Sequence, residues 1–109
     1  MKDRVSPEKG FYYHYKHRPE AGFRDYAYEV VGVGHHTEND GELFVVYRPL
    51  YESAMVYREG KMFDIRPLEM FMEDVTKEGK TFPRFKSITD TGLIKKLEEI
   101  RKEMYSVGA

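Results

Sequence analysis

Three arginines occur where apolar stretches of the sequence end. Arg48 and Arg66 each directly precede a proline, and Arg84 follows a proline and precedes Phe85. Guanidinium groups beside aromatic residues commonly bind carboxylates, phosphates or stacked bases. The alternative is a structural role, in which each arginine pairs with a carboxylate or a backbone carbonyl and fixes the end of a strand. The carboxylates considered for that role are Glu38, Glu42 and Glu69.

The four histidines raise the question of a metal site. His14 and His17 are three positions apart, and His35 and His36 are adjacent. In a β-strand both spacings place the two side chains on opposite faces, so neither pair chelates a metal from one regular strand. The chain has no cysteine and no HExxH or CxxC spacing. We therefore expect no metal site and no cofactor.

Nucleophilic catalysis and phosphate-binding loops have no signature here. None of the serines lies in a Gly-x-Ser-x-Gly elbow. Gly32 and Gly34 lie within a strand-like run with no helix after it, so they favour a bulge or bend over a phosphate loop. We expect a neighbouring group to crowd the missing side chain at whichever glycine bends the strand.

We expect His36, Glu38, Arg48, Arg66 and Arg84 to converge, although 48 positions separate the first from the last. Three cations at strand ends repel one another unless they share an anion. Glu38 is the nearest such anion in the chain, and a bound anionic ligand is the alternative. A second use of these residues is acid–base catalysis by His14 or His36 together with Glu38, with an arginine as anion clamp.

Composition sets the class of protein. A chain of 109 residues that is 40% hydrophobic and 15% aromatic is long enough for one small globular domain. No apolar run approaches the roughly 20 residues of a membrane span. The first nine residues are charged and have no hydrophobic signal segment. Together with the absence of cysteine, these features predict a cytoplasmic protein with no membrane partner.

The charge is unevenly distributed along the chain. Residues 1–24 and 80–109 each carry net +3, whereas residues 25–79 carry net −7, for a formal total of −1. Proteins that bind nucleic acid through its phosphates usually carry a basic excess. Non-specific nucleic-acid binding is therefore disfavoured, and only a local patch made by the two terminal segments would support it.

Runs rich in aromatic and β-branched residues predict strands, separated by turn residues. The predicted strands are 10–16, 26–36, 42–48, 55–58, 62–66 and 82–85, with a loop at 17–25 and turns at 37–41, 59–61 and 77–80. Prolines 49 and 67 end two of the strands. Both faces of the first strand carry rings, so the sequence leaves open which face is buried. The apolar spacing of Leu68, Phe71 and Met72 predicts one or two helical turns.

A longer helix is predicted over residues 91–105. Its apolar residues form one stripe, and Asp90 or Thr91 can cap its start. We expect the stripe to pack on the sheet and the charged residues between its members to form a solvated face. The stripe consists of Leu93, Ile94, Leu97, Ile100 and Met104.

These elements predict a mainly β fold: a small antiparallel SH3-like barrel with a short helical turn and a C-terminal α-helix. An OB-like barrel has a similar element pattern and stays open as an alternative. The expected organisation is a tail over 1–9, a barrel domain over 10–88 and a helix over 89–109 packed on the barrel.

Five ordered motifs also resemble a known family. They are Gly10-x-Tyr12-x-His14-Tyr15-Lys16, Tyr28-Glu29-Val30-x-Gly32-x-Gly34-x-His36-Thr37-Glu38, Val45-Val46-Tyr47-Arg48 with Leu50-Tyr51, Arg66-Pro67-Leu68-x-Met70-Phe71, and Pro83-Arg84-Phe85. Over about residues 10–88 they look like the short bacterial family called domain of unknown function 1653. The loop at 17–25 and the hairpin at 55–66 depart from its compact form, and the terminal helix lies outside it. The resemblance implies an SH3-type barrel and no established activity.

The polar positions of these motifs are the candidate ligand-binding residues, and no residue is assigned as catalytic. We expect a non-catalytic binding module whose aromatic and arginine-rich surface takes an anionic small molecule, a peptide or nucleic acid. The alternative is a small enzyme that uses His36 and Glu38. The candidate residues are His14, Lys16, His36, Glu38, Arg48, Arg66 and Arg84.

Overall fold

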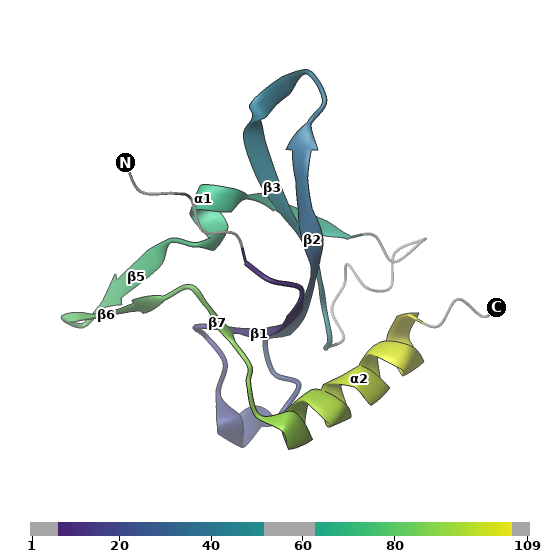
Figure 1. Cartoon of the computed structure of the whole chain (residues 1–109). Coiled ribbons are helices and arrows are strands. Elements are labelled where there is room, and N and C mark those ends of the chain that lie inside the picture. The colour runs from purple at the N-terminus through teal and green to yellow at the C-terminus, as the bar shows by residue number, and fades with distance from the viewer. Residues whose placement is uncertain (1–6, 52–62, 106–109) are drawn as a thin grey trace.

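The computed structural model of the chain describes residues 7–51 and 63–105. It contains an antiparallel five-stranded sheet, a separate two-stranded hairpin and a C-terminal helix (Figure 1). The sheet strands are β1 (Gly10–His14), β2 (Ala27–His36), β3 (Asn39–Pro49), β4 (Asp64–Pro67) and β7 (Phe85–Ser87). The hairpin strands are β5 (Asp74–Lys77) and β6 (Lys80–Pro83), and the helices are the short 3₁₀ turn η1 (Pro19–Ala21), α1 (Leu68–Phe71) and α2 (Thr91–Tyr105).

The strands of the main sheet follow the order β4-β3-β2-β1-β7, and every neighbouring pair is antiparallel. This confirms a mainly β, antiparallel fold with a terminal helix. Within the described ranges β4 and β7 are the two edges of the sheet and do not pair with each other, so the sheet is open. The predicted pairing of 55–58 with 62–66 falls largely on residues 52–62, outside the described residues. Its last part, Asp64–Pro67, forms β4 and pairs with β3.

Each face of the sheet buries its own group of apolar side chains, because the rings of β1 alternate between the two faces. The aromatic core lies on one face, where the rings of Phe71 and Phe85 stack at 4.1 Å. It comprises Tyr12, Val30, Val45, Tyr47, Leu68, Phe71 and Phe85. The helix-side core lies on the other face and comprises Phe11, Ala27, Leu50, Ile88 and Leu97.

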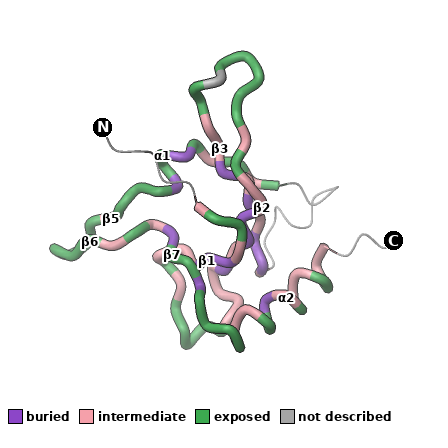
Figure 2. Tube along the Cα trace, viewed as in Figure 1, coloured by how far each residue is buried: buried purple, intermediate pink, exposed green. Residues whose placement is uncertain are grey.

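Helix α2 begins and packs as the apolar stripe predicts. Asp90 caps it, since the Asp90 carboxylate accepts the backbone N–H of Leu93 at 2.9 Å. Leu97 has no exposed surface, and other stripe residues pack against the same core. The helix therefore packs against the helix-side core, at one end of the sheet (Figure 2). None of the described helices is long and apolar enough to cross a membrane.

Strand β2 contains the predicted irregularity next to Gly32, but not the predicted crowding. The pairing register with β3 shifts between Val30 and Gly32, which is the signature of a β-bulge, and shifts again between His35 and His36. A Cβ atom added at Gly32 or at Gly34 would meet nothing within 4 Å. The expectation of a crowding neighbour is wrong, because both glycines face open space.

Candidate functional site

Two of the predicted site residues, His14 and Arg66, lie at the ring of Phe85, and a third, Arg84, lies near His14. We call these three residues the donor cluster. The rings of His14 and Phe85 meet edge to face at 5.0 Å, and the Arg66 guanidinium carbon lies 5.8 Å from the Phe85 centroid. Arg84 directly precedes Phe85, and the charges of both arginines act on His14. Strands β1 and β4 thus bring His14 and Arg66 to the aromatic-core face, and Arg84 comes from the residue between β6 and β7.

His14 is a neutral hydrogen-bond donor in this cluster. Burial, followed by the charges of Arg84, Lys16 and Arg66, lowers its pKa from 6.5 to about 4. The backbone N–H of Lys16 lies 3.2 Å from Nδ1 of His14, so Nδ1 accepts and the ring proton sits on Nε2. At neutral pH the imidazole therefore offers one N–H and no charge.

Arg66 is the arginine of the cluster without an acidic partner. Its Nε donates to the hydroxyl of Tyr47 at 3.1 Å, and no ion pair within the described residues includes Arg66. Asp64 lies two residues earlier on the same strand, and burial raises the pKa of its carboxyl while Arg66 opposes that rise. Arg66 therefore interacts with the Asp64 carboxylate only through space, and it makes no direct ion pair with a described residue.

Arg84 is held on one side only. Its Nη2 donates to the Glu73 carboxylate at 3.1 Å, and the Glu73 side chain is 53% exposed, which weakens this ion pair. Nε of Arg84 is buried and has no hydrogen-bond partner in the described structure. A buried N–H without an acceptor is costly, so this contact of Arg84 weakens its hold on the fold.

Aromatic side chains surround the donor cluster without adding negative charge. The ring of Tyr26 packs on His14 at 5.5 Å, and the Tyr28 and Tyr51 hydroxyls share a hydrogen bond of 2.5 Å. Burial and that hydrogen bond raise the pKa of Tyr28, and burial raises that of Tyr51. Both phenols are therefore neutral at physiological pH and add no negative charge to the cluster.

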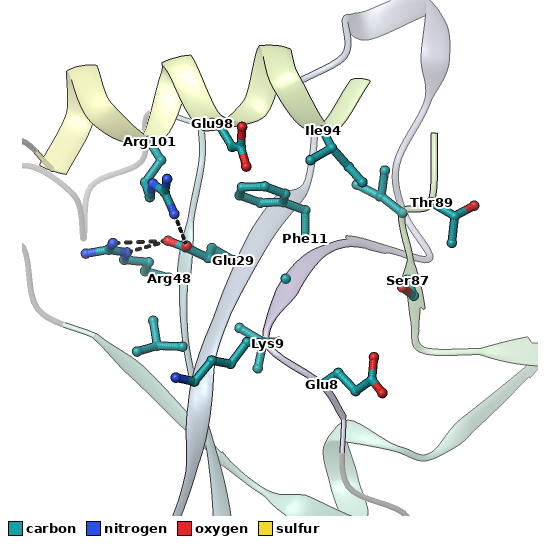
Figure 3. A pocket seen from close by; sticks show the side chains of 14 residues that line it. Glu8, Lys9, Phe11, Glu29, Arg48, Ser87, Thr89, Ile94, Glu98 and Arg101 are labelled. Atoms are coloured by element: carbon teal, nitrogen blue, oxygen red, sulfur yellow. Dashed lines mark hydrogen bonds and ion pairs between the residues drawn. The ribbon is translucent and has the colours of Figure 1, made fainter. Parts of the chain in front are cut away.

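Arg48 lies on the opposite face of the sheet, contrary to the expected convergence. It pairs in register with Glu29, and its Nη2 and Nε lie 3.0 and 3.1 Å from Oε1 of that residue. The other carboxylate oxygen, Oε2, accepts from Arg101 of α2 at 2.8 Å (Figure 3). Since residues 47 and 48 point to opposite faces, Arg66 beside Tyr47 cannot share an anion with Arg48.

His36 and Glu38 lie apart from all three arginines. Both are exposed at the tip of the long hairpin of β2 and β3, which projects from the body of the sheet (Figures 1 and 2). The backbone N–H of Glu38 donates to Nδ1 of His36 at 3.1 Å. Glu38 therefore pairs with none of the three arginines, and the prediction that all five side chains converge is wrong. Lys16 is exposed beside His14.

Sequence reasoning missed Glu29 and Arg101. Glu29 is the buried charged residue of the described chain, and Arg101 was expected on a solvated helix face. A carboxylate between the apolar residues of a central strand needs a cationic partner, and that signal was available for Glu29. The identity of that partner could not be predicted from the sequence, since 72 positions separate Glu29 from Arg101.

No three His, Cys, Asp or Glu side chains within residues 7–51 and 63–105 lie close enough to hold a metal ion. Arg48, Glu29 and Arg101 line a pocket of about 720 Å³ between α2 and the sheet (Figure 3). The molecule thus carries two polar features, the donor cluster on one face and this pocket on the other.

Comparisons with known proteins agree with the motifs. No curated protein matches the chain. A crystal structure of a protein of the same motif family, from Bordetella bronchiseptica, superposes with a TM-score of 0.56 at 28% identity, covering 77% of this chain and 90% of that one. The family model described as "Protein of unknown function (DUF1653)" matches residues 10–87, which include every strand and exclude α2. The chain therefore belongs to the DUF1653 family.

Proposed function

We propose that the chain is a non-catalytic binding module, built on an SH3-like barrel over residues 10–88, that binds an anionic small molecule at the donor cluster. The observation that carries the proposal is Arg66, a half-buried guanidinium beside Tyr47 that has no carboxylate partner in the described structure. A cytoplasmic location, expected from the composition, is part of the same proposal.

The chemistry of the donor cluster favours an oxyanion. His14 offers Nε2–H, and Arg66 and Arg84 offer the guanidinium donors that Tyr47 and Glu73 do not use. Forked guanidinium donors match the oxygens of phosphate and carboxylate groups. The rings of Tyr26 and Phe85 beside the same histidine supply apolar contact for the rest of the ligand.

A small molecule is favoured over nucleic acid as the source of that oxyanion. The formal net charge of the chain is −1, whereas binding to a phosphate backbone relies on a basic excess. No described feature favours the enzyme alternative, since His36 and Glu38 are exposed at a hairpin tip.

The test is calorimetric titration of the intact chain with inorganic phosphate, a nucleoside monophosphate and citrate. We expect at least one probe to bind, and to raise the stability of the fold by about 2.7 kcal/mol at 100 times its Kd. Arg66→Ala should abolish binding and leave the melting temperature almost unchanged. Arg48→Ala is the matched control, because it should lower stability and leave binding intact. Failure of all three probes to bind, or full binding by Arg66→Ala, overturns the proposal.

A further inference from the structure

The pocket between α2 and the sheet lies on the face opposite the donor cluster. It has a volume of about 720 Å³ and is bounded by α2, the start of β1, the centre of β2 and the residues after β7 (Figure 3). We call it the helix–sheet pocket. Its size is within the roughly 300–1,000 Å³ of typical small-molecule sites. We infer that the helix–sheet pocket binds a small zwitterion, an amino acid or dipeptide with an apolar side chain.

One end of the pocket is cationic and fixed in orientation. Glu29 engages Arg48 through one carboxylate oxygen and Arg101 through the other. Two guanidinium groups around one carboxylate leave a net charge of +1, and the opposite charges of Glu8 and Lys9, which also line the pocket, offset each other. Glu29 does not use Nη2 of Arg101, whereas the free end of the Arg48 guanidinium points away from Phe11 (Figure 3). The free donor of Arg101 fits the carboxylate of a ligand, and Glu29 holds Arg101 in place before the ligand arrives.

A carboxylate without a partner lies close to that cationic end. Glu98 extends from α2 toward the ring of Phe11 (Figure 3) and belongs to no ion pair within the described residues. Glu98 and Arg101 are three positions apart on one helix, so they are neighbours on its surface at about 5–6 Å between Cβ atoms. Arg101 turns to Glu29 instead. An ammonium and a carboxylate on one α-carbon, or on a dipeptide, match this pair of opposite charges.

The floor of the pocket is apolar. Phe11 is 6% exposed and Ile88 is 9% exposed, and Ile94 lines the side formed by α2. An apolar side chain placed over Phe11 would lose water from both surfaces, at roughly 25 cal/mol per Å² of apolar area. The walls therefore favour a leucine-like side chain between the two charged ends.

The test is titration of the isotope-labelled intact chain with leucine and leucyl-leucine, followed by amide chemical shifts in α2 and β1. We expect at least one of these two zwitterions to shift the amides of Phe11, Ile94 and Arg101. N-acetyl-leucine lacks the ammonium group of leucine, and leucine amide lacks its carboxylate. Each of these blocked compounds should bind at least tenfold more weakly than leucine. Absence of saturable shifts with both zwitterions, or equal binding of a blocked form, overturns the inference.

Single substitutions on α2 distinguish binding at the helix–sheet pocket from a non-specific effect of the net charge of the protein. Glu98→Gln should weaken zwitterion binding about tenfold and leave the already weak binding of N-acetyl-leucine unchanged, since that ligand has no ammonium group. Stability should not fall, because Glu98 belongs to no ion pair within the described residues. Glu99→Gln is the matched control, because the Glu99 side chain is 71% exposed and faces solvent on the same helix. Equal loss in both variants contradicts the assignment of Glu98. Arg66→Ala should leave zwitterion binding unchanged, so this inference and the proposed oxyanion site can fail separately.

Discussion

Arg101 of the terminal helix donates to Glu29 at the centre of the sheet, with Nη1 2.8 Å from Oε2. The same carboxylate accepts from Arg48 of β3, whose guanidinium lies 4.2 Å from the Tyr105 ring centroid. Tyr105 in turn donates its hydroxyl proton to the carbonyl of Pro49 at 2.6 Å. Helix α2, which lies outside the part of the chain matched by the family, is therefore attached to the family's sheet by polar as well as apolar contacts.

Replacing Glu29 with glutamine should destabilise the fold strongly. The Glu29 side chain is only 12% exposed, so the substitution leaves two guanidinium groups poorly compensated at a largely buried position. Removing one partner of a buried ion pair costs about 3–5 kcal/mol in unfolding free energy. Urea denaturation measures this loss. Glu99→Gln, which touches only the exposed and long 3.8 Å pair with Lys102, should change stability by less than about 0.5 kcal/mol.

Ending the chain at Asp90 should promote association. Without α2, the helix-side core loses Leu97 and exposes the apolar side chains of Phe11, Leu50 and Ile88. Exposed apolar patches of this kind drive proteins together. Size-exclusion chromatography with light scattering measures the association. In the full chain, Leu97→Ala should lower stability by about 2–5 kcal/mol. A truncated chain that stays monomeric and equally stable would show that the helix has no structural partner on the sheet.

The order of the elements was predictable because their signals are local. An apolar stripe at helical spacing and a capping aspartate define α2, and turn residues separate the strands of each hairpin. Strand pairing is not local, and a shift of one residue in register moves a side chain to the other face. Arg48 and Arg66 both end a strand before a proline. Arg66 pairs with Val45 and Arg48 with Glu29, and these registers send them to opposite faces.

The two polar features differ in how far the sequence predicted them. Position in the family motifs identified His14, Arg66 and Arg84, and the structure brings these three together. Motif position did not identify Glu29 as a partner of Arg48, because Glu29 reaches its cations only through pairing with β3 and packing against α2. Contacts made between distant segments depend on register and helix docking, which no local pattern encodes.

Alanine should be tolerated at Gly32 but not at Gly79. A Cβ atom at either position meets open space, so the difference lies in the backbone. Gly79 has φ of +78° in the turn between β5 and β6, where a side chain is strained, whereas Gly32 lies outside the left-handed region. We expect Gly79→Ala to cost about 1 kcal/mol, and Gly32→Ala to be neutral or to stabilise by up to about 1 kcal/mol. The melting temperatures of both variants, compared with that of the wild type, measure these two effects. A loss at Gly32 as large as that at Gly79 would mean that the bulge itself requires glycine.

His14 should make the stability of the fold depend on pH between about 6.5 and 4. Burial and the nearby cations lower its pKa to about 4 in the folded chain, whereas an unfolded histidine titrates near 6.5. Between these values the unfolded chain binds a proton that the folded chain does not, so stability falls as pH falls. His14→Gln should flatten this part of the profile, measured by urea denaturation at half-unit steps. His36→Gln, at the exposed hairpin tip, should keep the wild-type slope. An unchanged slope in His14→Gln would mean that the imidazole is protonated freely in the folded state, and that the donor cluster tolerates a third positive charge.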